Sequence, residues 1–133
     1  MAGSNVPSGR KYTKDHEWAK FAGKEVTVGI TAFAVEQLGD ITLVNVDAKV
    51  GETITAGKAF GTIESVKTLS DLYAPIAGKI LEVNKDLDAK PELVNEDCYG
   101  KAWMIAITPK DAGEVGKLMD AAAYSEHLKS AAH

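Results

Sequence analysis

The sequence predicts a mainly β fold of the sandwich or barrel type, in one domain with a short pair of helices at its C-terminal end. Short apolar runs rich in β-branched residues recur along the chain, and glycine or proline separates them at short intervals. After Pro109 the spacing of apolar residues changes to that of a helix. A length of 133 residues, 45% of them hydrophobic, is sufficient for a single core.

The first part of the chain predicts a β-hairpin, a short helix and a further strand. Alternating apolar residues on both sides of a glycine indicate a hairpin within residues 11–30. Thr31 can cap a helix over Ala32–Leu38, and Gly39 can end it. The β-branched run Ile41–Val46 then favours a strand.

Shorter elements complete the predicted domain. These are strands over Lys58–Val66, Thr68–Tyr73 and Lys79–Val83, a helical turn at Pro91–Val94, and a buried strand over Trp103–Ile107. A C-terminal helical pair, over about 111–130, is indicated by apolar residues at helical spacing: Val115, Leu118, Met119, Ala121, Tyr124 and Leu128. We expect residues 1–10 to form a flexible N-terminal segment and residues 11–133 to form the domain.

Composition and charge argue against several classes of protein. The formal net charge is −4, and no cluster of lysine or arginine offers a nucleic-acid surface. No apolar run approaches the roughly 20 residues that span a bilayer, so no membrane association is expected. The single cysteine, Cys98, excludes an internal disulfide and favours a reducing compartment, and the three histidines are too scattered to indicate a metal site.

The segment Glu64–Asp71 has an unusual arrangement around Lys67. One strand-like run leads to this lysine and another leads away from it, so we expect Lys67 at the tip of a hairpin. An exposed tip between two rigid strands would present a single amine to an enzyme. On composition alone, an ordinary solvated turn lysine is the better interpretation, because most lysines are merely solvated.

The surrounding sequence resembles the glycine cleavage H-protein family. The matching blocks keep the order and spacing of that family: Tyr12–Trp18, Val28–Thr31, Leu38–Ile41, Glu64–Lys67 followed by Ser70–Asp71, Ala74–Asn84, Pro91–Asn95, and Tyr99–Gly100 ahead of Trp103. The resemblance implies a barrel-sandwich hybrid of two antiparallel sheets, as in lipoyl- and biotinyl-carrying domains, with short C-terminal helices. Residues 11–133 would then be a single lipoyl-binding domain.

The resemblance also implies a cofactor and site residues. Lipoic acid would be joined through an amide to Lys67, and Glu64 would help the lipoylating enzyme, a lipoate ligase or lipoyltransferase, to recognise the tip. Glu17 and Asp71 would be the acids of a cleft that shelters the protonated amine of the aminomethyl-lipoyl group. For these two residues an ordinary surface position is the alternative.

The function implied by the resemblance is that of a non-catalytic carrier. It would shuttle the aminomethyl intermediate and reducing equivalents between glycine decarboxylase (P protein), aminomethyltransferase (T protein) and dihydrolipoyl dehydrogenase (L protein). We expect a monomer in the bacterial cytoplasm, with the mitochondrial matrix as the alternative.

Other interpretations stay open at this stage. The chain could be an H-like protein that relays lipoyl groups to other complexes, or a lipoyl or biotinyl domain of another carrier system. Val66 and Thr68 flank the lysine where a biotin domain typically has methionine, which argues against biotin. A hydrolytic or transferase enzyme would need a nucleophile and a base, and Cys98 and His16 make no convincing pair. Trp18 and Trp103 are expected to pack in the core.

Overall fold

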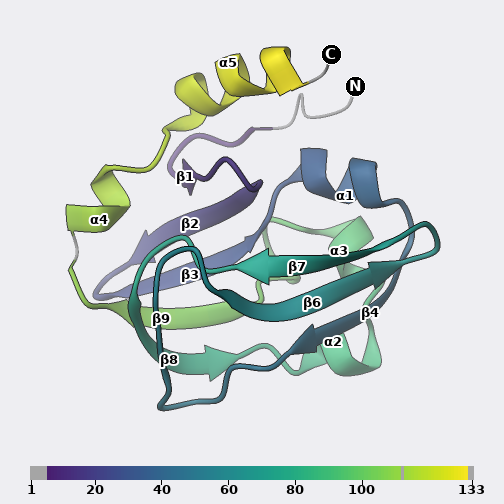
Figure 1. Ribbon diagram of the computed structural model, residues 1–133, viewed down its shortest axis with the longest axis horizontal. Coiled ribbons are helices and arrows are strands. Elements are labelled where there is room, and N and C mark those ends of the chain that lie inside the picture. Colours follow the sequence, from purple (N-terminus) through teal and green to yellow (C-terminus); the bar gives the residue numbers. More distant parts are fainter. Residues whose placement is uncertain (1–5, 112, 132–133) are drawn as a thin grey trace.

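The computed structural model describes residues 6–111 and 113–131, and it contains two antiparallel sheets that face one another (Figure 1). In the described residues, the larger sheet has the order β1 (Lys11–Tyr12), β2 (Glu17–Ala22), β3 (Glu25–Ile30), β9 (Ile105–Pro109), β8 (Gly78–Val83) and β5 (Thr53–Ile54). The smaller sheet has the order β4 (Ile41–Val46), β6 (Ala59–Ser65) and β7 (Leu69–Tyr73). The predicted mainly β fold with two antiparallel sheets is therefore confirmed, and neither sheet closes into a barrel within these residues.

Short helices connect and flank the strands. They are α1 (Ala32–Leu38), α2 (Asp86–Ala89), α3 (Leu93–Glu96), α4 (Gly113–Gly116) and α5 (Ala121–Ala131). The last two are the short C-terminal helices that the apolar spacing predicts, and α5 lies alongside the N-terminal strand (Figure 1). None of the helices in the described part of the chain is long and apolar enough to cross a membrane.

The core lies between the two sheets, because alternate residues of the strands point inward. Its largest fully buried side chains are Phe60, Ile63, Leu72, Ile76, Ile80, Leu87, Met104, Ile105 and Ile107. A second cluster attaches α5 to the larger sheet through Tyr12, Trp18, Phe33, Tyr124 and Leu128. The predicted core position of Trp18 is confirmed, whereas Trp103 is half-buried and packs against this second cluster.

The β2–β3 hairpin holds Trp18 against the sheet. Trp18 pairs with Gly29 across the two strands, and a Cβ atom on Gly29 would lie 2.7 Å from the indole ring. The Trp18 Nε1 donates a hydrogen bond to the Cys98 carbonyl at 3.0 Å. The absence of a side chain at Gly29 therefore makes room for the tryptophan.

Helix α1 begins and ends where its local signals predict. Thr31 is extended, and its hydroxyl accepts a hydrogen bond from the Ala34 N–H at 3.3 Å. Gly39 follows the helix with φ +83°, a conformation that a residue with a side chain rarely adopts. The chain then continues directly into β4.

The β6–β7 hairpin carries the segment around Lys67. Both strands are slightly shorter than predicted, so residues 66–68 form the connection between them. Strand β6 is the central strand of the smaller sheet, and among residues 6–111 and 113–131 the edge strand β7 pairs on one side only. One edge of this hairpin is therefore available to line a site.

The predicted flexible segment, residues 1–10, lies partly outside the described residues, which begin at Val6. Val6 packs against the second core cluster. The Arg10 guanidinium donates a hydrogen bond to the Tyr99 carbonyl at 2.7 Å and lies 5.0 Å from the centre of the Trp18 ring. Residues 6–10 thus make specific contacts with the domain.

Candidate functional site

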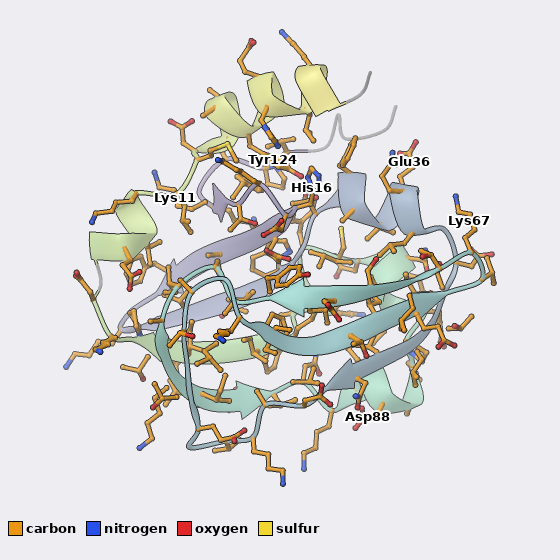
Figure 2. All side chains as sticks on the ribbon, viewed as in Figure 1. Lys11, His16, Glu36, Lys67, Asp88 and Tyr124 are labelled. Carbon is orange, nitrogen blue, oxygen red and sulfur yellow. The ribbon has the colours of Figure 1, made fainter. Side chains whose placement is uncertain are left out.

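Lys67 is exposed at the end of the β6–β7 hairpin (Figure 2). The turn depends on Ser65, whose hydroxyl accepts hydrogen bonds from the backbone N–H groups of Lys67 and Thr68, both at 3.2 Å. The Ser65 N–H also donates to the Thr68 carbonyl at 2.8 Å. These bonds fix the backbone of a three-residue connection and leave the lysine side chain outside it. The predicted placement of Lys67 at a hairpin tip agrees with this geometry.

The hairpin tip is fastened to the end of α1. The Val66 N–H donates to the Asp40 carbonyl at 3.0 Å. A Cβ atom on Gly39 would lie 3.0 Å from Lys67 Cε, so the lysine stem runs directly over this glycine. Asn95, from α3, holds the same corner: its amide accepts from the Ile41 N–H at 2.9 Å and donates to the Gly39 carbonyl at 3.0 Å.

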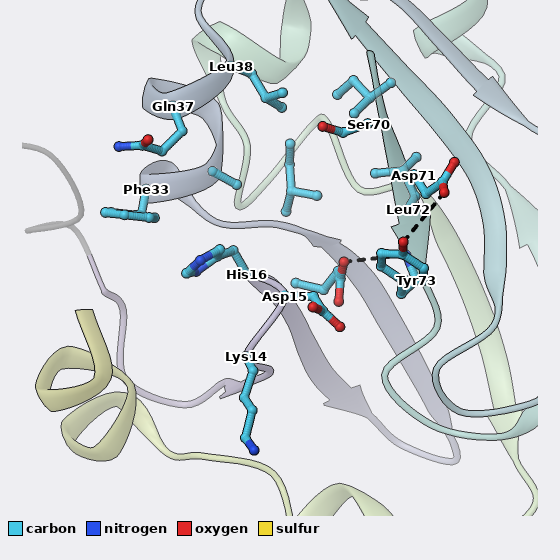
Figure 3. Close-up of a pocket in the computed structure, with 14 residues that line it drawn as sticks. Lys14, Asp15, His16, Phe33, Gln37, Leu38, Ser70, Asp71, Leu72 and Tyr73 are labelled. Atoms are coloured by element: carbon cyan, nitrogen blue, oxygen red, sulfur yellow. Dashed lines mark hydrogen bonds between the residues drawn. The ribbon is translucent and has the colours of Figure 1, made fainter. Parts of the chain in front are cut away.

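A cleft of about 560 Å³ lies between α1, the turn before β2, and the free edge of β7 (Figure 3). Along β7 it extends from Ser70, three residues after Lys67, to Tyr73. Its lining residues are Lys14, Asp15, His16, Glu17, Ile30, Phe33, Ala34, Gln37, Leu38, Ile63, Ser70, Asp71, Leu72 and Tyr73. Apolar side chains of α1, β6 and β7 therefore form much of its wall, with acidic side chains at one end. The two acids that the sequence analysis assigned to a cleft, Glu17 and Asp71, both line it.

Glu17 is the buried acid of the cleft, with 2% of its surface exposed. Its carboxyl accepts hydrogen bonds from Thr13 Oγ1 at 2.8 Å and from the Tyr73 N–H at 3.4 Å. Burial nevertheless raises the pKa of Glu17 to about 8, because the two hydrogen bonds only partly offset the loss of water around the charged form. Burial of Glu17 therefore favours the protonated, uncharged carboxyl at neutral pH.

Asp71 is the exposed acid of the cleft. Its carboxylate accepts a hydrogen bond from the Tyr73 hydroxyl at 3.4 Å (Figure 3). The negative charge of Asp71 raises the pKa of Tyr73, which keeps that hydroxyl a donor. The cleft thus contains one buried neutral acid and one exposed carboxylate.

His16 joins the cleft to the C-terminal helix, a connection that the sequence analysis missed. Its φ of +68° turns the chain just before β2. Its Nδ1 lies 2.8 Å from the Tyr124 hydroxyl, which lies 2.7 Å from Thr31 Oγ1. Burial, followed by the proximity of His127, lowers the pKa of His16, so the ring is neutral. These residues position the turn that carries Glu17.

The structure gives less support to a metal site and to a catalytic cysteine. No group of three metal-ligating side chains occurs among the described residues. Cys98 is half-buried, and burial raises the pKa of its thiol to about 11, which makes it a poor nucleophile. Glu64 is exposed on β6, opposite Leu43 of β4 and Leu69 of β7. This position is compatible with contact by an enzyme that approaches the hairpin tip.

Comparison with known proteins gives the family. The model of the glycine cleavage H-protein family matches residues 10–131. A glycine cleavage system H protein of Halalkalibacterium halodurans is 51% identical over 125 residues, which cover 94% of this chain and 97% of that protein. One from Bacteroides thetaiotaomicron is 53% identical over 120 residues, which cover 90% and 94% of the two chains.

A solved structure agrees with the sequence matches. The crystal structure of a glycine cleavage system H protein from Mycobacterium marinum superposes with a TM-score of 0.82 at 40% identity, and it covers 96% of this chain and all of that one. Family model, sequence relatives and fold therefore agree over nearly the whole length. The chain belongs to the glycine cleavage H-protein family, the lipoyl carriers of the glycine cleavage system.

Proposed function

We propose that Lys67 is the residue that carries lipoic acid, through an amide at Nζ, and that the protein itself catalyses no step. The observation that supports this is the position of Lys67: an exposed amine on a turn fixed by Ser65, next to a partly apolar cleft. When bound, lipoic acid supplies a disulfide that accepts a one-carbon amine unit and electrons. The chain supplies the attachment point and the shelter.

The cleft fits an acylated lysine in length and in character. An extended arm of about twelve bonds from the Lys67 Cα spans roughly 14 Å. Asp71, the third residue of β7, lies four residues after Lys67, which corresponds to at most roughly 13 Å of extended chain. An arm folded back along the edge of β7 would therefore end beside Asp71, with Leu72 and Phe33 as parts of its apolar surroundings. Acylation removes the charge of the amine, which makes burial of the arm less costly.

Glu17 and Asp71 would bind a cationic amine at the end of the cleft. An ammonium group next to Glu17 favours the ionised carboxylate, so the carboxyl would give up its proton as the cation enters. The exposed Asp71 carboxylate would add a second charge-assisted contact, each such contact contributing about 1.5–3 kcal/mol. Both contacts would hold the amine away from water.

The partners and location follow from the family role as further proposals. The carrier would visit glycine decarboxylase, aminomethyltransferase and dihydrolipoyl dehydrogenase in turn and present the far end of the lipoyl arm to each. A lipoate ligase or lipoyltransferase would modify it, and Glu64 would contribute to recognition. The monomeric state and the bacterial cytoplasm stay predictions.

Intact mass after incubation with a lipoate–protein ligase, lipoate and ATP tests the attachment site. We expect one lipoyl increment on the natural chain, none on Lys67→Arg, and a full increment on the control Lys58→Arg, which changes another exposed lysine next to the smaller sheet. An increment that persists in Lys67→Arg, or modification by biotin in place of lipoate, would overturn the assignment.

A further inference from the structure

We propose that the enzyme that attaches the lipoyl group docks on one exposed patch at the open end of the smaller sheet. The patch, called here the hairpin patch, consists of Leu43, Glu64, Val66 and Leu69. This inference rests on the proposed modification of Lys67, and it adds the surface that the modifying enzyme contacts.

The patch gathers most of the large apolar side chains that the described part of the chain leaves in water. Leu43 is 48% exposed, Leu69 is 60% exposed and Val66 is 68% exposed. The other two large apolar side chains exposed in the described part of the chain are Phe21 and Val50, which lie outside the patch. Exposed apolar side chains that cluster, instead of being scattered singly, mark an interaction surface. Here Leu43 and Leu69 lie at one end of the smaller sheet, and Val66 lies in the connection that joins two of its strands at that end.

The strand register explains why these side chains share a face. Leu43 of β4 lies opposite Glu64 of β6, and Glu64 lies opposite Leu69 of β7. Residues directly opposite one another in antiparallel strands project to the same side. In the next row Val44 pairs with Ile63, and both are buried. The row of Leu43, Glu64 and Leu69 therefore points away from the core, with the acid between two leucines.

The chemistry at Lys67 indicates which enzyme would bind the hairpin patch. Before modification, Nζ extends only about 6 Å from the Lys67 Cα along five bonds. An enzyme that acylates this nitrogen must therefore contact the hairpin tip, and Val66 and Leu69 lie one and two residues from the lysine. Enzymes that act on the far end of the finished arm work roughly 14 Å from the same Cα. They can reach it without covering the patch.

The charges around the tip define the complementary surface. Glu64 lies within the patch, and Glu36 is exposed on the α1 side of Lys67 (Figure 2). Asp40 is also exposed, and its carbonyl accepts a hydrogen bond from the Val66 N–H. A partner that covers this end needs an apolar depression for the leucines and basic side chains for the acids. The structure thus favours an attaching enzyme whose active-site entrance is apolar and rimmed by basic residues.

The test measures the rate of lipoyl attachment by intact mass, with a bacterial lipoate–protein ligase, lipoate and ATP. The double change Leu43→Thr, Leu69→Thr keeps strand-forming residues and removes the apolar surface. We expect its kcat/KM for attachment to fall at least about tenfold, because two exposed leucines no longer become buried on docking. Circular dichroism and Tm show whether the variant keeps its fold.

A matched pair of single changes gives the control. Val66→Thr and Val50→Thr exchange the same atoms at positions that are 68% and 64% exposed, and only Val66 lies in the patch. We expect Val66→Thr to slow attachment about threefold or more, and Val50→Thr to leave it unchanged.

Each contrary result has a distinct meaning. If the natural chain is lipoylated on Lys67 but the double variant is lipoylated at the same rate, the patch is not the docking surface. If the double variant, once loaded, loses glycine decarboxylase-dependent exchange as severely as it loses attachment, the occupant is instead a glycine cleavage enzyme. If sedimentation shows a dimer that the double change dissociates, the occupant is a second copy. A natural chain that takes no lipoyl group on Lys67 overturns the proposed function itself.

Discussion

Replacement of Glu17 by glutamine tests the cleft directly. Glutamine preserves the size of the side chain, and its carbonyl can accept the hydrogen bonds from Thr13 Oγ1 or the Tyr73 N–H. The change removes the ability of the side chain to ionise. Its effect on stability should therefore depend on pH and follow the pKa of Glu17.

The sign and size of the effect come from the raised pKa of Glu17. Its value rises from 4.5 to about 8, so between these pH values the folded protein retains a proton that the unfolded chain has released. The stabilisation linked to this proton is fully present below about pH 4.5 and is lost as pH rises through about 8. At about 1.4 kcal/mol per tenfold change in ionisation, the limit of this loss is roughly 5 kcal/mol. Water in the open cleft lessens it, and we expect about 2–4 kcal/mol.

Urea unfolding at pH 5 and at pH 8.5 measures the effect. At pH 5 we expect Glu17→Gln and the natural chain to differ little, and at pH 8.5 we expect the variant to be more stable by about 2–4 kcal/mol. Glu36→Gln is the matched control, because Glu36 is exposed on α1 and glutamine has a similar helix propensity. An advantage of Glu17→Gln that is the same at both pH values, or greater at pH 5, would refute the reasoning.

Two further predictions concern the cleft and the corner that supports Lys67. In the loaded carrier, the double change Glu17→Gln, Asp71→Asn should speed the loss of the bound amine by about tenfold or more, because two charge-assisted contacts disappear. Mass spectrometry of the loaded protein over time measures the rate of this loss. An unchanged rate would contradict the proposal that the two acids protect the amine. Gly39→Ala should lower the free energy of unfolding by about 1–3 kcal/mol, because it places a side chain at φ +83°. Denaturant titration measures the free energy of unfolding of Gly39→Ala and of the control Gly116→Ala, where the added carbon has no neighbour within 4 Å from elsewhere in the described part of the chain. Equal effects at the two glycines would contradict the prediction for Gly39.

Local signals predicted the elements that depend on local interactions. Helix α1 has the predicted limits because Thr31 supplies the cap and Gly39 supplies the conformation that ends the helix. Strand β4 also has the predicted limits, since its β-branched residues favour extended backbone. The C-terminal helices appear where the apolar spacing changes.

Elements that depend on distant partners were missed or displaced. The two-residue strand β5 exists because it pairs with the distant strand β8, and it has no distinctive sequence. The two-residue strand β1 pairs with the neighbouring β2, and its Tyr12 also forms an isolated bridge with the distant Met119. The predicted strand over Trp103–Ile107 begins two residues later, at Ile105, because Trp103 and Met104 precede its ladder. The one-turn helix α2 was not predicted.

The site was predictable only in part. The hairpin around Lys67 follows from the sequence, because two strand-like runs adjoin it. The approach of Glu17 to β7, across more than 50 positions, followed only from the family resemblance, and the burial that raises the pKa of Glu17 had no signal in the sequence. The contact of His16 with Tyr124 joins residues 108 positions apart and was missed for the same reason.

The unpaired edge of β7 carries a risk of aggregation, and the residues around the cleft reduce this risk. A strand with unpaired backbone groups invites the strand of another molecule, which is a common beginning of aggregation. In this fold the Tyr73 N–H donates a hydrogen bond to the Glu17 carboxyl group, and α1 lines the cleft next to β7. The cleft thereby stays open beside β7 without leaving a template for fibril growth, so changes that widen the cleft should increase aggregation of the protein.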